Sequence, residues 1–434
     1  MINFLTTFLL FIFITNCSLD TKSNIWTKEK KLVKEKKNPI KLLFKEEKVL
    51  ENEFNPNLKI KLSGKLINNS FINNFDNNNG RINYKGNLKK ISRFKFSKID
   101  HFDEFEPEII FSKNNVIFFD NNGSILKFDN SSKLIWKKNF YSKFEKKLKP
   151  VLFFATYKDT LVVTDSISKY YAMNINTGEL LWSKNHSAYF NSQVKIYKDK
   201  IFVVDSENDL ICYSLNDGSK LWKIKTERTL IKSIKKLSLL IVKNKVYFIN
   251  SMGDVSAVDI ETGNLLWLTP TQSTEFIGQS FFIKSSYLVA NKNSIFVSNN
   301  KNQFFSLDLD TGILNWKHKI NSTLTPTLVD NLIFTITMEG LLIVIDSQKG
   351  NIIRITDIFK QFKKKKRSKI KPVGFIIGSE NIYLTTNHGR LMIIEVRSGK
   401  NISMIKIDND KISRPFVLNQ NLYIVKENSI IRLN

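Results

Sequence analysis

Cysteine and histidine are both scarce in this 434-residue chain. If Cys17 is lipidated, Cys212 has no partner, and a disulfide-stabilised scaffold is excluded. The four histidines are scattered and show no metal-ligand spacing; they are His101, His186, His318 and His388. We therefore expect no histidine-based metal site and place each histidine at the surface or at a sheet edge.

Long apolar runs are also rare. Residues 4–14, within FLTTFLLFIFIT, are too few to cross a bilayer and fit the apolar part of a secretory signal. The run leads into ITNC, which resembles the lipobox of bacterial lipoproteins, with Cys17 as the lipidated residue; Ser18 is compatible with sorting to the outer membrane. Asn16 departs from the usual small residue and no Lys or Arg precedes the run, so an ordinary signal, cleaved or uncleaved, is the alternative. We predict an export signal over residues 1–17 and a membrane attachment by lipid at Cys17.

Acidic residues are too few to balance the basic ones: 40 Asp and Glu face 67 Lys and Arg, a net charge of +27. Such an excess is typical of proteins that bind nucleic acid, acidic proteins or anionic lipid. Because Lys, Asn, Ile and Phe are over-used throughout the chain, the excess alone does not identify a partner. Residues 18–56 are dense in Lys and Glu and predict a flexible tether, while the Asn-rich residues 57–88 are ambiguous.

A repeated segment dominates the rest of the chain. YYAMNINTGELLWS, at residues 170–183, recurs as CYSLNDGSKLWK, SAVDIETGNLLWL, FSLDLDTGILNWK and, more faintly, LKFDNSSKLIWKK. The recurrent tryptophans are separated by 46, 40, 45 and 49 residues; they are Trp136, Trp182, Trp222, Trp267 and Trp316. Two further units keep the glycine but have Arg354 and Ser403 in the tryptophan column, and an eighth unit stops at Asn434. A segment that recurs this often indicates a structural repeat and not a catalytic motif.

Each unit alternates with the period of a β-strand. Apolar residues stand five and three positions before the glycine, a small residue stands six before it, and a polar residue stands four before it. Cys212 belongs to the small column, so we expect a packing residue. The polar column contains Asp259, Asp308 and Asp346, for which we expect turn and edge hydrogen bonds. Gly178 and its equivalents fit a tight turn that requires positive φ.

Units of this length, each a small antiparallel meander, predict an all-β fold, a β-propeller of four-stranded blades over residues 57–434 with repeats from 109. Seven units are visible and the eighth is truncated, which leaves seven or eight blades. Residues 87–96 can supply the missing outer strand, close the ring and remove two open edges.

The D-x-x-TG-x-x-LW units resemble PQQ-like (pyrroloquinoline-quinone-like) repeats, in which the Trp packs between blades. Together with the lipobox, the tether and a ring closed by an N-terminal strand, they resemble the BamB-like lipoproteins of the outer-membrane β-barrel assembly machinery. The resemblance implies a non-enzymatic scaffold, held by lipid at the periplasmic face of the outer membrane as a monomer within a larger complex. It also implies a partner, the periplasmic domains of the barrel-forming assembly subunit.

Two alternatives share the repeat. A quinoprotein-type PQQ-dependent dehydrogenase would need a Ca²⁺ site of several oxygen ligands, a catalytic Asp and, in many members, a vicinal disulfide. The sequence contains no Cys pair and no clustered ligands, so we expect no catalytic residue, cofactor or metal. An exported propeller that binds polysaccharide or cell wall is the other alternative.

Three connections between successive blades are basic and should lie on one face: residues 141–150, 225–238 and 359–371. The resemblance to BamB-like proteins implies that the second connection is the one that contacts the assembly subunit. By position in the repeat, our candidate contact residues there are Arg228, Ile231, Lys232 and Ile234; in the third connection they are Lys363, Lys364, Lys365 and Lys366. We count Lys235 and Lys236 among the lysines of the same face. Export and the lack of interleaved aromatic residues argue against nucleic acid as the partner.

Overall fold

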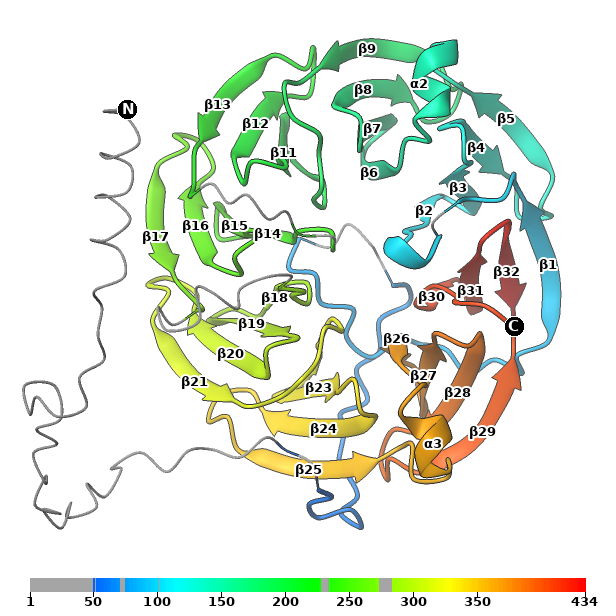
Figure 1. Ribbon diagram of the computed structural model, residues 1–434, viewed down its shortest axis with the longest axis vertical. Helices are drawn as coiled ribbons and strands as arrows, with labels where there is room; N and C mark the ends of the chain where they lie inside the picture. The colour runs from blue at the N-terminus through cyan, green and yellow to red at the C-terminus, as the bar shows by residue number, and fades with distance from the viewer. Residues whose placement is uncertain are drawn as a thin grey trace, which may run out of the picture. The chain divides into compact units, whose positions relative to one another are not determined.

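The computed structural model describes residues 50, 52–70, 75–100, 102–227, 233, 235–272 and 283–434. These residues form eight four-stranded antiparallel sheets arranged as blades around a central axis (Figure 1). The protein is therefore an eight-bladed β-propeller, which decides between the seven and eight blades that the repeats left open.

Seven blades use four strands that are consecutive in the chain, ordered from the axis outward. The first four of these are built from β2 (Ile110–Ser112), β3 (Asn115–Phe119), β4 (Ile125–Phe128), β5 (Leu134–Lys138), β6 (Leu152–Tyr157), β7 (Thr160–Asp165), β8 (Lys169–Asn174), β9 (Leu180–Asn185), β10 (Lys195–Tyr197), β11 (Lys200–Val204), β12 (Leu210–Ser214), β13 (Lys220–Ile224), β14 (Leu239–Val242), β15 (Lys245–Ile249), β16 (Val255–Asp259) and β17 (Leu265–Thr269). The next three are built from β18 (Val289–Ala290), β19 (Ser294–Asn299), β20 (Gln303–Asp308), β21 (Leu314–His318), β22 (Thr327–Val329), β23 (Leu332–Ile336), β24 (Leu341–Asp346), β25 (Ile352–Asp357), β26 (Pro372–Ile377), β27 (Asn381–Thr386), β28 (Arg390–Glu395) and β29 (Asn401–Lys406).

The eighth blade joins the two ends of the propeller. It contains β30 (Phe416–Leu418), β31 (Asn421–Lys426) and β32 (Ser429–Leu433), with β1 (Lys90–Lys95) as the outer strand. β1 pairs antiparallel with β32, from Lys95 opposite Ser429 to Lys90 opposite Leu433. The closing strand therefore lies where the sequence predicts it, and the backbone edge of β32 is covered.

Three short helical segments of the described residues lie in connections between blades: η1 (Phe102–Glu104), α2 (Lys143–Lys147) and α3 (Lys364–Arg367). They follow β1, β5 and β25, each an outer strand that leads to the inner strand of the next blade. With four antiparallel strands in every blade, all such connections emerge on one side of the ring, which we call the connection face. Within the described part of the chain, no helix is long and apolar enough to span a bilayer.

The repeated glycine turn joins the third and fourth strands of a blade. Gly178 has φ +75° and Gly312 φ +72°, a region that L side chains rarely adopt. In the turn at Gly312, the carboxylate of Asp308 accepts hydrogen bonds from the backbone N–H groups of Asp310 and Thr311, at 3.0 and 2.8 Å. The acidic column thus stabilises turns, as its position in the repeat predicts.

The tryptophans lie at the junctions between blades. Trp182 donates from Nε1 to the backbone carbonyl of Leu215 in the next blade, at 2.9 Å, and its ring covers Gly218 so closely that a Cβ there would lie 2.6 Å away. Cys212 is fully buried opposite Trp222, and burial raises the pKa of its thiol to about 12. An apolar site with so little thiolate suits packing and not nucleophilic chemistry.

Arg354 occupies the tryptophan column at the junction between β25 and the next blade. It is fully buried opposite Val344, and its guanidinium donates to the backbone carbonyls of Val396, at 3.3 Å, and Arg397. These carbonyls precede Gly399 by three and two residues, the positions of Leu215 and its neighbour before Gly218 in the Trp182 junction. The guanidinium therefore supplies the hydrogen bond between blades that an indole N–H makes elsewhere.

Candidate binding site at the mouth of the central channel

The chain before β1 crosses the channel along the inner strands. Backbone N–H groups of Ile241 in β14 and Ala290 in β18 donate to the carbonyls of Phe75 and Asp76, at 2.8 and 3.0 Å. Ile82 donates to the carbonyl of Ile377, the last residue of β26, at 2.7 Å. These partners lie in the second half of inner strands, which run away from the connection face, and Figure 1 shows the segment crossing the centre of the ring.

A buried polar network holds this segment in place. The side-chain amide of Asn77 donates to the backbone carbonyls of Leu239 and Leu288, each at 2.9 Å. The amino group of Lys195 donates to Asn77 Oδ1 at 2.6 Å, and burial lowers the pKa of Lys195 to about 7. The axis of the propeller is thus filled by hydrogen-bonded side chains of the protein itself.

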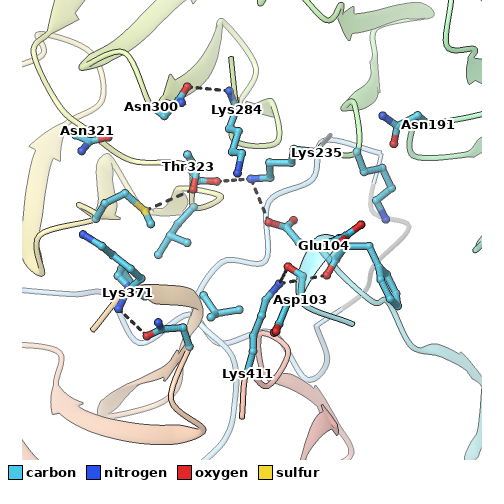
Figure 2. A pocket seen from close by; sticks show the side chains of 18 of the residues that line it. Asp103, Glu104, Asn191, Lys235, Lys284, Asn300, Asn321, Thr323, Lys371 and Lys411 are labelled. Carbon is cyan, nitrogen blue, oxygen red and sulfur yellow. Dashed lines mark hydrogen bonds and ion pairs between the residues drawn. The ribbon is translucent and has the colours of Figure 1, made fainter. Parts of the chain in front are cut away.

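A cavity of about 500 Å³ remains at the mouth on the connection face. Figure 2 shows side chains that converge on it from several connections. Among the described residues that line it, five are lysines: Lys235, Lys236, Lys284, Lys371 and Lys411. They come from the connections that precede β14, β18, β26 and β30, so strands distant in sequence bring them together.

An acidic segment of the chain, residues 102–108, lies in this mouth, and we call it the acidic strap. Lys236 pairs with Glu108 at 2.8 Å, and Lys235 pairs with Glu106 at 3.3 Å. Lys411 donates to the backbone carbonyl of Asp103 at 2.6 Å (Figure 2). Burial lowers the pKa of Lys411, while Glu106 and Asp103 oppose this shift.

Lys235 and Lys236 differ from the sequence expectation. They were expected among the surface charges of the connection face, but Lys236 is buried and the side chain of Lys235 is 9% exposed. Both turn toward the axis because Glu106 and Glu108 of the acidic strap lie there. They are therefore part of the channel mouth and carry little charge to the outer surface.

The other predicted contact residues fall into two groups. Lys363, Lys364, Lys365 and Lys366 lie at the start of α3, where none of the helix residues is buried. Arg228, Ile231, Lys232 and Ile234 lie outside the described residues, as does Cys17. Because α2 and α3 follow different blades, the basic connections are spread around the connection face (Figure 1).

Two of the described histidines, His186 and His318, contact groups of the protein itself. His186 contacts Asp205 at 3.1 Å and the hydroxyl of Tyr213 at 3.0 Å, and His318 contacts the carbonyl of Gly350 at 2.6 Å. Among the residues that the structure describes, no group of three or more His, Cys, Asp or Glu side chains is placed to hold a metal ion.

A model of the family described as outer membrane protein assembly factor BamB matches residues 121–356, more than half of the chain. The chain belongs to the BamB family. The match extends from the turn before β4 into β25, so it spans most of the repeated blades.

BamB from Moraxella catarrhalis has a similar structure, with a TM-score of 0.65 at 15% identity over 80% of this chain and 99% of that chain. A europium-containing methanol dehydrogenase has a TM-score of 0.64 at 11% identity, over 82% of this chain and 89% of that chain. The quinohemoprotein alcohol dehydrogenase from Comamonas testosteroni has a TM-score of 0.61 at 9% identity, over 81% of this chain and 78% of that chain. At these identities the likeness shows the propeller fold alone. A sequence search of curated proteins finds no significant match.

The dehydrogenase relatives of the BamB-type propeller raise the question of a bound quinone and metal. The donor set here does not fit: the mouth is lined by lysines, which repel a cation, and two of them pair with Glu106 and Glu108 of the acidic strap. Deeper in the channel, Asn77 and Lys195 occupy the axis. The described residues of the channel therefore do not fit a quinone held together with Ca²⁺.

This mismatch predicts that Ca²⁺ leaves the protein's thermal unfolding midpoint unchanged in the presence of PQQ. A specific ligand at a hundred times its Kd would add about 2.7 kcal/mol of stability. Differential scanning fluorimetry with and without Ca²⁺ measures the shift, and a dye-linked assay measures alcohol oxidation. A saturable Ca²⁺-dependent rise in the midpoint, together with alcohol oxidation, would contradict the prediction.

Proposed function

We propose that this chain is a non-enzymatic lipoprotein scaffold of the outer-membrane β-barrel assembly machinery, exposed on the periplasmic face of the membrane. The single observation that carries the proposal is the match of the BamB family model to residues 121–356. Asn77 and Lys195, which bond to each other in the channel, leave less room there for a bound cofactor, and this agrees with a scaffold role.

We propose further that the connection face docks on the periplasmic domains of the barrel-forming subunit. Connections between rigid strands vary freely in sequence and present side chains to partners. Two of them display charge and apolar surface: α3 exposes a run of basic residues, and Phe144 in α2 is 71% exposed. An exposed phenylalanine among lysines can lose its water on contact, while the lysines speed the encounter.

Replacing Lys363, Lys364, Lys365 and Lys366 together by Glu should slow association with the assembly subunit and reduce its salt dependence. Charges at the rim of an interface act mainly on the association rate, through a field that salt screens. Biolayer interferometry over a salt titration measures both rates. In the same assay, Ile231→Asp should raise the dissociation rate, because it removes an apolar anchor from the candidate contact set.

A matched control places the same charge change on the opposite side of the ring. The control uses four of the exposed lysines in turns that face away from the connections: Lys158, Lys198, Lys292 and Lys349. Their replacement by Glu should leave the association rate nearly unchanged. If the two quadruple variants slow association equally, only the net charge matters and the connection face is not the docking surface.

A second prediction concerns the membrane anchor. Changing Cys17 to Ala should release the protein from envelope membranes or block its processing, because the thiol is the proposed site of lipid attachment. Membrane fractionation and labelling with an acyl-chain analogue test this. Cys212→Ala, which removes the other thiol, should retain both the label and the membrane association. Full retention of Cys17→Ala in the membrane fraction, with no label on the native protein, would argue against a lipid anchor.

A further inference from the structure

Two lysines at the channel mouth differ from their neighbours in their partners. Lys235, Lys236 and Lys411 are engaged by the acidic strap. Lys284 and Lys371 also line the cavity and are exposed, yet no carboxylate in the described part of the chain lies within ion-pair distance of their amino groups. The mouth therefore keeps two cationic groups available to a ligand that enters from the connection face (Figure 2).

The acidic strap shows what chemistry the mouth accepts. Its sequence, FDEFEPE at residues 102–108, alternates carboxylates with aromatic and proline residues. The lysines bind both the side chains and the backbone of this segment. Lys236 pairs with the side-chain carboxylate of Glu108, and Lys411 donates to the backbone carbonyl of Asp103. Ionised groups make the shorter and stronger hydrogen bonds, so a carboxylate-rich peptide gains most from such a site.

The cavity also has an apolar part. Phe153, Leu324, Met338 and Val373 line it beside the lysines. Its volume of about 500 Å³ lies within the range of ligand-binding pockets. Among the described residues of the lining, five lysines outnumber the three carboxylates of Asp103, Glu104 and Glu106. A concave site with low-dielectric walls and an excess of positive charge favours an incoming anion.

We propose that the channel mouth is a binding site for an acidic, aromatic-containing peptide segment of another protein, with its carboxylates on Lys284 and Lys371 and its apolar side chains against Leu324 and Met338. The acidic strap is an internal copy of this ligand that occupies the neighbouring part of the mouth. The inference concerns ligand chemistry and does not depend on the assembly role.

A fluorescein-labelled peptide of the sequence FDEFEPE, titrated with the full-length protein, tests the site by fluorescence anisotropy. We expect saturable binding that weakens as salt is added, and no binding of the neutral peptide FNQFQPQ. Replacing Lys284 and Lys371 together by Glu should weaken binding by about tenfold or more, since two attractions become repulsions. Glu106→Gln releases Lys235 from its ion pair and should strengthen binding.

Lys292 and Lys349 provide the matched control, because both are exposed lysines in turns on the opposite side of the ring. Their joint replacement by Glu should leave the affinity unchanged, and circular dichroism checks that both double variants are folded. The proposal is overturned if the peptide does not bind, if the neutral peptide binds equally well, or if the two double variants lose affinity to the same extent.

Discussion

Replacing Phe94 by Asp is expected to destabilise the propeller by more than about 4 kcal/mol, the range of an unpaired charge buried in a core. Phe94 lies on the closing strand β1 and is fully buried. Its ring contacts Phe128 of the adjacent blade and Tyr423 of its own blade, with centroids 5.7 and 6.2 Å apart. A carboxylate there would lose both contacts and separate β1 from the ring it closes. Urea unfolding followed by tryptophan fluorescence measures the loss.

The control for this prediction lies on the same strand. Ile91 is 45% exposed, so Ile91→Asp introduces the same charge without burying it and should change the stability by about 0.5 kcal/mol or less. Equal unfolding midpoints for Phe94→Asp and the unmodified protein would mean that the eighth blade holds without β1. If Phe94→Asp and Ile91→Asp lower the stability to the same extent, the charge on this strand, and not its burial, is the cause.

Arg354→Ala is expected to lower the free energy of unfolding by about 3 kcal/mol, because it leaves a cavity and removes the donor from buried backbone carbonyls. The guanidinium donates to the carbonyls of Leu58, at 3.0 Å, and Val396, at 3.3 Å, so it joins β25 to the next blade and to the chain that precedes β1. Burial lowers the pKa of Arg354 to about 10, which shows that the charge is poorly solvated. Thermal and urea unfolding both report the change.

Arg354→Trp separates the role of the hydrogen bond from that of the charge. At three other junctions, an indole in this position donates to the carbonyl three residues before the glycine of the next blade; Trp222 does so to Ile260 at 3.2 Å. We therefore expect the Trp variant to retain more than half of the stability that Ala loses. If Trp and Ala are equally destabilising, the guanidinium is not a substitute for the indole, and the contact with Leu58 carries the effect.

The repeat made the blades predictable. Gly178 and Gly312 could be assigned to positive-φ turns, and Asp308 to capping such a turn, because these interactions join residues close in sequence. Cys212 could be assigned to packing because its column is small in every clear unit. The closing strand followed from counting strands, since the truncated last unit leaves an edge that only the N-terminal side can cover.

The filled channel could not be predicted. Residues 57–88 were ambiguous because they have polar composition and no period, although Asn77 makes some of the most buried contacts in the molecule. Lys235 and Lys236 were placed among the surface charges of the connection face, because a lysine-rich connection looks alike whether it faces solvent or an acidic strap. Arg354 looked like a missing tryptophan, and only the position of the carbonyls in the next blade shows what replaces it.

The sequence by itself determined the all-β class, the four-stranded blade and the glycine turns, because side-chain alternation and turn chemistry are local and repeat in every unit. The tertiary structure alone decided what the ring encloses. Lys195 meets Asn77 across 118 positions of sequence, and Lys284, Lys371 and the acidic strap come from different connections. No periodicity encodes such pairs, since they become neighbours only when the closed ring brings its connections together around one axis.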